Sequence, residues 1–153
     1  MRLLPGEAIY LAAGNLHAYL SGVGVEIMAN SDNVLRGGCT PKHVDVPELL
    51  RVLDFRCGPI DKVEATSADG VEFVYPTPTE EFRLSRLQPR PGGPARPERR
   101  GPEILLCVEG AVRLSSGSES LALPRGASVF VSAAEGPYTL EGEGTVFRAT
   151  AGL

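Results

Sequence analysis

Four side chains suited to acid–base, metal and phosphate chemistry lie in one short stretch, residues 17–42. His17 can bind a metal or move a proton near neutral pH, and Glu26 can act as a general base. Arg36 and Lys42 carry positive charges that can receive a phosphate or stabilise an oxyanion. The stretch therefore predicts half of an active site for a small anionic ligand.

Taken singly, each of these residues has a plainer interpretation. His17 could be a turn histidine bonded to a nearby carbonyl, and Arg36 followed by two glycines resembles a common surface loop. Lys42 alone would be solvent-exposed. Glu26 could point outward from a strand, because alternation would leave Val25 and Ile27 on the packed face. The catalytic interpretation needs further support.

The elements around these residues are predicted to be strands joined by tight turns. Residues 8–12 and 24–28 are short apolar or alternating runs with glycines at or near their ends. A β-hairpin between them would bring His17 and Glu26 to one face. Polar turns at Asp32-Asn33 and at residues 36–42 would follow.

Two motifs give that support. Gly6, Ala12, Gly14 and His17 resemble the second metal motif of the cupins, with Ala12 where proline is usual. The run from His17 to Lys42 resembles the signature of the type I mannose-6-phosphate isomerases: His-Ala-Tyr, then Glu-x-Met-Ala-x-Ser-Asp-Asn, then Arg-Ala-Gly-x-Thr-Pro-Lys. One departure is noted, Gly37 in place of alanine. So many fixed positions make this match far more specific than a single glycine motif.

This resemblance implies a zinc-dependent isomerase that interconverts mannose 6-phosphate and fructose 6-phosphate through a cis-enediol. The product would feed mannose into activated-sugar synthesis, including GDP-mannose. Carried over by position, His17 would be a zinc ligand and Glu26 an active-site carboxylate. Arg36 would be a catalytic or charge-stabilising guanidinium, and Lys42 would bind the substrate. The implied fold is mainly β, a cupin or jelly-roll-like β-sandwich.

The family's zinc ligands are a glutamine, two histidines and a glutamate, most of them from a segment that precedes the His-Ala-Tyr run. This sequence has only His17 and His43 as imidazoles, and a catalytic zinc normally needs three protein ligands. The resemblance covers Leu3 to Leu153 but only the C-terminal part of a full-length enzyme. We therefore expect residues 1–55 to be the end of a catalytic cupin, completed by an N-terminal segment, and residues 56–153 to be a second cupin-like domain.

The remaining sequence predicts one helix and many strands. Residues 46–55 have Asp45 as a possible cap, Pro47 in the first turn and leucines at helical spacing. Short strands are predicted at residues 71–75, 82–87, 104–108, 111–114, 121–123, 128–131, 138–140 and 146–149, with hairpin turns at Glu109-Gly110 and Ser116-Gly117. This spacing is typical of a sandwich or jelly roll.

Residues 88–102 are rich in Pro, Gly and Arg and are predicted to be a mobile loop. The second part of the chain also has a cupin-like cadence, at residues 109–114 and 123–131, but no histidine accompanies it. We expect its role to be structural.

Composition narrows the possible partners. Hydrophobic residues make up 42% and charged residues 22%, and no apolar run is long enough to span a bilayer. The formal net charge of −4 argues against nucleic acid as a partner. Pro5-Gly6 interrupts any signal-peptide core, so a cytoplasmic location is expected. The three widely spaced cysteines are expected to be reduced.

A second functional class stays open: a non-catalytic, cupin-like structural or ligand-binding module, which could pair exposed strand edges with a copy of itself.

Overall fold

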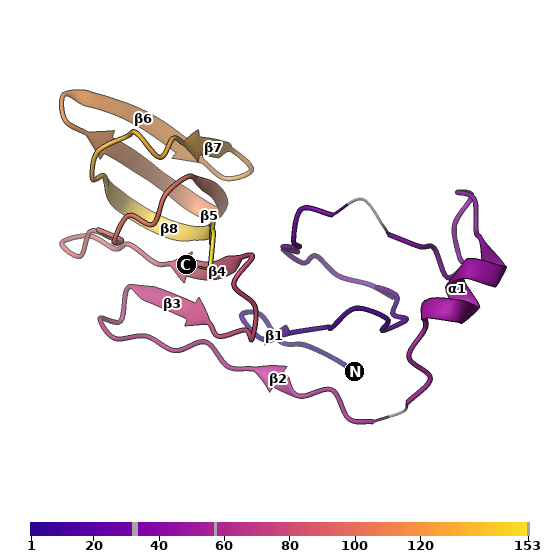
Figure 1. The fold of residues 1–153 in the computed structure, drawn as a ribbon. Coiled ribbons are helices and arrows are strands. Elements are labelled where there is room, and N and C mark those ends of the chain that lie inside the picture. The colour runs from indigo at the N-terminus through magenta and orange to yellow at the C-terminus, as the bar shows by residue number, and fades with distance from the viewer. Residues whose placement is uncertain (32–33, 57, 153) are drawn as a thin grey trace.

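The structure is a computed structural model, and it describes residues 1–31, 34–56 and 58–152. Strands dominate it, as the sequence predicts (Figure 1). In chain order the elements are β1 (Ala8–Ile9), α1 (Val46–Val52), β2 (Lys62–Val63), β3 (Glu72–Tyr75), β4 (Arg83–Leu87), β5 (Glu103–Ser116), β6 (Glu119–Pro124), β7 (Ser128–Val131) and β8 (Thr139–Thr150).

Six of the strands form one antiparallel sheet. Its order is β3-β4-β8-β5-β6, and β7 pairs with the first part of β5. The sheet rolls over itself, so that β6 and β7 lie across from the β3–β4 end (Figure 1). β1 and β2 form a separate two-stranded ladder. Between β1 and β2 the chain makes a long excursion that carries α1.

β5 and β8 are each one long strand where the sequence predicts two short ones. The predicted hairpin at Glu109-Gly110 is wrong: the register of β5 against β8 shifts between Cys107 and Glu109, which is a β-bulge. Gly110, at φ 69° just beyond the bulge, lies in the left-handed region, and a Cβ there would meet the Glu143 carbonyl oxygen on β8. The hairpin predicted at Ser116-Gly117 is confirmed, since it joins β5 to β6.

The core lies on one face of this sheet. Its most buried members have no exposed surface: Leu87, Leu105, Cys107, Leu140 and Val146. They come from three central strands, because inward-facing residues alternate along each strand. Among the described residues, none before Tyr75 is buried. The first part of the chain therefore has no core of its own in this structure.

The loop at residues 88–102, which the sequence predicts to be mobile, is attached to the large sheet at Ala95. Ala95 is 1% exposed, and its backbone exchanges two 2.9 Å hydrogen bonds with Leu140 on β8. Proline lacks an amide donor, which keeps the loop out of the regular sheet. Ala95 still pairs because its own amide is available.

Helix α1 begins as predicted. The Asp45 Oδ1 accepts a 3.0 Å hydrogen bond from the Glu48 amide, and Pro47 lies in the first turn. The helix ends at Val52 rather than near Phe55, because Leu53 is already extended, with ψ 137°.

The cysteines form no disulfide in the described part of the chain. Cys39 is exposed and Cys107 is buried, and both are free thiols. Cys57 lies outside the described residues. The described part also contains no helix of the length and apolarity that crossing a membrane requires.

Candidate active site

The turn that leads into His17 is anchored on the end of α1. The Asp54 amide donates a 3.0 Å hydrogen bond to the Gly14 carbonyl oxygen. Gly14 has φ 84°, and a Cβ there would lie 3.1 Å from the Val52 carbonyl oxygen. Only glycine fits this approach without strain. The predicted glycine turn before His17 is therefore present.

His17 is exposed and has one defined partner. Its Nδ1 lies 3.0 Å from the Asn15 carbonyl oxygen. A carbonyl only accepts hydrogen bonds, so we assign the proton to Nδ1, which leaves the Nε2 lone pair free. That tautomer is suited to binding a metal through Nε2.

Glu26 is linked to His17 through a tyrosine. The Tyr19 hydroxyl donates a 2.8 Å hydrogen bond to the Glu26 Oε1, and the Tyr19 and His17 rings meet edge to face at 5.9 Å. The hydrogen bond to Glu26 raises the pKa of Tyr19, so its hydroxyl stays protonated. Tyr19 is the tyrosine of the His-Ala-Tyr motif, and the sequence alone assigns it no role.

The predicted hairpin is wrong. No strand is assigned in the described residues between β1 and α1, so the run 24–28 has no ladder and the predicted strand 8–12 reduces to Ala8–Ile9. The side-chain alternation still holds, because Val25 and Ile27 are half-buried while Glu26 is exposed. An extended segment needs a neighbouring strand to become a β-strand, and this segment has none here.

The turn that contains Arg36 lies close to the segment that leads into His17. Gly37 lies directly against the Leu16 side chain, so the Arg36-Gly37 turn is next to the residue that precedes His17. Arg36 itself is exposed. Asp32 and Asn33, which belong to the predicted polar turn, lie outside the described residues.

Lys42 is also exposed, in a turn where its amide donates a 3.1 Å hydrogen bond to the Thr40 hydroxyl. In the described part, no hydrogen bond or ion pair joins Lys42 or Arg36 to His17 or Glu26. The structure thus brings together His17, Tyr19 and Glu26 and leaves the two cations open to solvent.

These residues do not form a zinc site by themselves. Among the described residues there is no cluster of three or more His, Cys, Asp or Glu side chains able to hold a metal ion. His43 is exposed, beside Lys42. The described residues therefore offer separate imidazoles at His17 and His43 rather than a ligand set.

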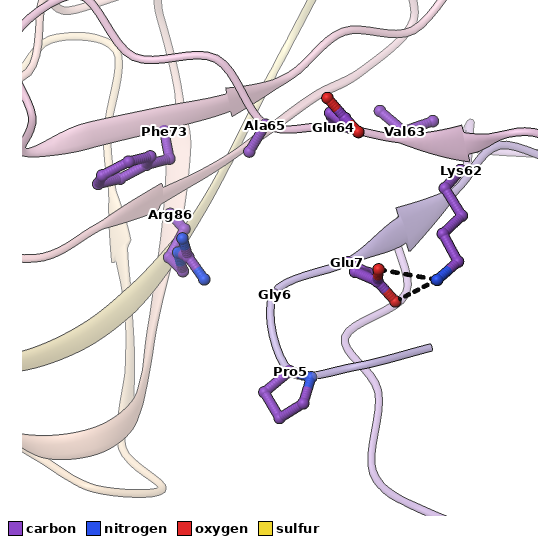
Figure 2. Close-up of a pocket in the computed structure, with 9 residues that line it drawn as sticks. All are labelled: Pro5, Gly6, Glu7, Lys62, Val63, Glu64, Ala65, Phe73 and Arg86. Carbon is purple, nitrogen blue, oxygen red and sulfur yellow. Dashed lines mark hydrogen bonds and ion pairs between the residues drawn. The ribbon is translucent and has the colours of Figure 1, made fainter. Parts of the chain in front are cut away.

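Two open cavities of about 360 Å³ flank the β1–β2 ladder. Figure 2 shows the first, where Arg86 faces Gly6 from β4 and lies 5.0 Å from the centre of the Phe73 ring, while Lys62 is paired with Glu7 at 2.6 Å. None of the four predicted site residues lines either cavity.

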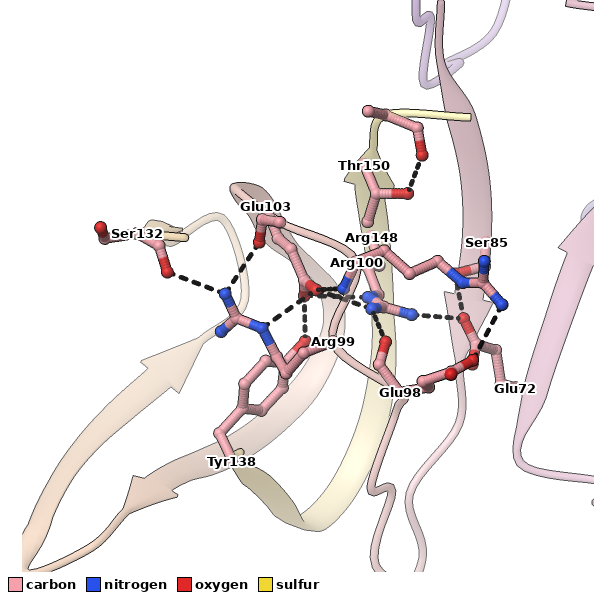
Figure 3. A network of polar contacts seen from close by, with 12 residues as sticks. Glu72, Ser85, Glu98, Arg99, Arg100, Glu103, Ser132, Tyr138, Arg148 and Thr150 are labelled. Carbon is pink, nitrogen blue, oxygen red and sulfur yellow. Dashed lines mark hydrogen bonds and ion pairs between the residues drawn. The ribbon is translucent and has the colours of Figure 1, made fainter. Parts of the chain in front are cut away.

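The most strongly coupled charges lie elsewhere, in the core of the large sheet (Figure 3). Arg148, 1% exposed, binds both carboxylate oxygens of Glu103, at 2.9 and 2.7 Å, and one oxygen of Glu72, at 2.9 Å. The Tyr138 hydroxyl donates to Glu103 at 2.6 Å, and the Ser85 hydroxyl donates to Glu72 at 2.6 Å. We call these five residues the buried network.

Burial alone would raise the pKa of the Glu103 carboxyl, but hydrogen bonds from Arg148 and Tyr138 together with the Arg148 charge leave that pKa below its usual value. Burial and the bond to Glu103 raise the pKa of Tyr138. The network is therefore ionised at Glu103 and Arg148 and enclosed by the core. It ties β3, β4, β5 and β8 together, and its two central side chains, Glu103 and Arg148, are closed off from solvent.

The fold and site together define the class. A rolled antiparallel sheet with a closed core is joined to a glycine-rich segment that presents a histidine and a carboxylate, which is a mainly β protein of the cupin type. The family model described as "Mannose-6-phosphate isomerase, cupin domain" matches residues 98–151.

Curated relatives extend the match to almost the whole chain. The mannose-6-phosphate isomerase of Escherichia coli is 41% identical over 149 residues, covering 97% of this chain. Mannose-6-phosphate isomerase 2 of Arabidopsis thaliana is 39% identical over 134 residues, covering 87%. The chain spans only 38% and 30% of the length of these two relatives.

Solved structures agree. The apo form of mannose 6-phosphate isomerase from Salmonella typhimurium superposes with a TM-score of 0.71 at 34% identity, over 82% of this chain and 32% of that one. A mannose 6-phosphate isomerase bound with zinc and yttrium gives 0.70 at 33% identity, over 81% of this chain and 32% of that one. The chain is thus related to the mannose-6-phosphate isomerases and corresponds to their C-terminal portion.

Proposed function

We propose that this chain supplies part of the active site of a mannose-6-phosphate isomerase, which interconverts mannose 6-phosphate and fructose 6-phosphate through a cis-enediol. The observation that carries the proposal is the His17–Tyr19–Glu26 cluster inside the isomerase signature, on a chain 41% identical to the Escherichia coli enzyme. The reaction moves a proton between two adjacent carbons and needs a base, a stabilised oxyanion and a phosphate site.

Four side chains of this chain divide these tasks: Glu26, Tyr19, Arg36 and Lys42. Glu26 is the active-site carboxylate, and Tyr19 fixes its orientation through the 2.8 Å hydrogen bond. Arg36 stabilises negative charge that develops on the enediol oxygens, and Lys42 binds the substrate phosphate. Both cations are unpaired with acidic groups in the described residues, which leaves them available to an anion.

Zinc is proposed for the complete site, with His17 as the one ligand from this chain. A related isomerase structure is bound with zinc. The described residues provide no ligand set, so the other ligands are assigned to the portion of the enzyme that the matches leave out.

The N-terminal portion of the isomerase, which the matches leave out, is the proposed partner of this chain. Apolar side chains in the first part of the chain are exposed to an unusual degree, such as Leu20 at 96%, Val23 at 104%, Tyr19 at 75% and Phe55 at 69%. A segment that buries so little apolar surface does not offset the entropy of ordering its backbone. We assign residues 1–55 to a catalytic cupin completed by an N-terminal portion, carried on the same or another polypeptide. Residues 56–153 form the second domain.

The cellular role follows from the reaction: a cytoplasmic enzyme that supplies mannose 6-phosphate for GDP-mannose synthesis. The small-molecule partner is a phosphosugar, and neither nucleic acid nor a membrane is proposed as a partner. The net charge of −4 supports this.

The test is an isomerase assay on the chain with and without the missing portion. The chain is co-expressed with the N-terminal portion of the Escherichia coli relative, and conversion of mannose 6-phosphate is measured on the purified pair. Activity of the pair, lost in Glu26→Gln, supports the proposal. An inactive but stably folded complex refutes it.

The second candidate is a non-catalytic cupin-like module. It is favoured by the closed core of the large sheet and by the lack of a metal-ligand cluster in the described residues. It predicts that no pairing with an N-terminal portion restores isomerase activity.

A further inference from the structure

The outer face of the large sheet is divided into an apolar half and a polar half. Because directly paired residues in antiparallel strands share a face, the strand registers place six apolar side chains together on the face opposite the core. This apolar half consists of Phe73, Leu84, Ile104, Leu106, Phe130 and Phe147. Arg86 lies on the same face between Phe73 and Phe147, and its guanidinium is 5.0 Å from the centre of the Phe73 ring.

The same face changes character beyond the β-bulge in β5. Its outward residues there include Arg113, Ser115, Ser120, Glu141 and Glu143. This polar half is an ordinary solvated surface. A single sheet face that is apolar at one end and charged at the other indicates that only the apolar end is covered by another part of a protein.

One edge of the apolar half is already covered by this chain. The Tyr75 hydroxyl, on the same face, donates a 3.0 Å hydrogen bond to the Gly6 carbonyl oxygen, and Tyr75 is only 4% exposed. The Phe147 ring stacks on Tyr75 at 6.4 Å. The segment before β1 therefore lies against the β3–β4 end of this face (Figure 2).

The far edge, on β5 and β7, is open. Ile104 is 52% exposed and its direct partner Phe130 is 66% exposed. Leu106, next on the same face, is half-buried. The apolar half is thus covered where the first part of the chain reaches it and bare where that part stops.

We infer that the apolar half is the surface on which the N-terminal portion of the catalytic cupin packs, with Ile104 and Phe130 contacting it directly. Two observations select this occupant. The covered edge is held by residues 5–7, which we assign to the same catalytic cupin, so the interface continues one that exists. The relatives also carry more than half of their length outside the matched part, enough to cover the remainder. This inference rests on the proposed function, because it takes the partner from it.

The test measures assembly separately from activity. The chain is co-expressed with the tagged N-terminal portion of the Escherichia coli relative, and the ratio of the two polypeptides recovered on the tag is determined. Phe130→Asp and Ile104→Asp are expected to reduce recovery at least tenfold. The matched control is Ala122→Asp, on the polar half of the same face and directly opposite Arg113, which is expected to leave recovery unchanged.

Both test residues are exposed, so the isolated variants should keep the melting temperature of the unsubstituted chain, and a variant that melts early is replaced by Phe130→Ser. Recovery equal to the control in both test variants overturns the inference, as does failure of the unsubstituted chain to be recovered. A homodimer that the same substitutions dissociate assigns the face to a second copy and also overturns it. If the unsubstituted complex forms but has no isomerase activity, and Phe130→Asp dissociates it, the proposed function is refuted and this interface is supported.

Discussion

Removing the Arg148 guanidinium should be the most damaging single change in the large sheet. Arg148→Met keeps most of the side-chain volume but leaves the Glu103 carboxylate, which has no exposed side-chain surface, without its two bonds of 2.9 and 2.7 Å. Breaking a buried ion pair from one side costs about 3–5 kcal/mol. For a domain of the size of residues 56–153, which contain the large sheet, each kcal/mol of lost stability lowers the melting temperature by about 4–8 °C. We expect a fall of at least about 12 °C, taking the lower limit of both ranges.

The assay is thermal unfolding followed by circular dichroism. The matched control is Arg113→Met on the polar half of the same sheet, where the guanidinium is exposed and makes one 3.4 Å hydrogen bond to Ser120. Its expected effect is within about 0.5 kcal/mol. An Arg148→Met variant that melts with the control would refute the view that this pair holds the strands together.

The pH dependence has a defined sign. The pKa of Glu103 is lowered in the folded protein, so its contribution to stability is fully present above the unfolded pKa, about 4.3, and is lost as the pH falls through the folded value. Arg148→Met removes the main causes of the lowering, the Arg148 hydrogen bond and charge, and leaves the Tyr138 hydrogen bond opposed by burial, which raises the pKa. The difference in melting temperature between the two proteins should therefore be larger at pH 7 than at pH 4.

Three local predictions concern the segment around the candidate site. Gly14→Ala should release the turn before His17, since φ 84° and the Val52 carbonyl both oppose a Cβ; faster hydrogen exchange of the Asp54 amide would show it, and unchanged exchange would contradict it. Gly37→Ala introduces the residue that is usual in the isomerase signature. It should change the free energy of unfolding by no more than about 1 kcal/mol, because the new Cβ meets only the flexible, 62% exposed Leu16 side chain. A large loss of stability or of complex activity would count against this. Asp45→Ala should destabilise α1 by about 1 kcal/mol through loss of its cap, detected as faster exchange in residues 48–50.

The sequence predicted much of the fold because local rules governed it. The Asp45 cap and Pro47 define the start of α1, and alternation in residues 128–131 defines β7, whose predicted bounds match. The errors arose where a glycine served a long-range purpose. The sequence predicts a turn at Gly110, whereas Gly110 lies next to the β-bulge and allows β5 to approach the Glu143 carbonyl oxygen of β8 closely.

The site was only partly predictable. The signature points to His17 and Glu26. The Tyr19 side chain between them, whose hydroxyl donates to Glu26 and whose ring meets the His17 ring, is visible only in the structure. The predicted hairpin failed because a strand needs a neighbour, and the described residues offer none to the run 24–28. The roles of His17, Glu26, Arg36 and Lys42 all stay predictions. In the described residues, Arg36 and Lys42 form no hydrogen bond or ion pair with the cluster.

Zinc binding by the assembled protein tests the central claim most directly. The chain, paired with the N-terminal portion of the Escherichia coli relative, is compared with the chain alone and with a pair carrying His17→Ala, and zinc is measured per complex after dialysis. The account predicts about one zinc in the pair, none in the chain alone, and a large loss with His17→Ala while the pair still forms. One zinc held by the chain alone, or full zinc retained without His17, would contradict it.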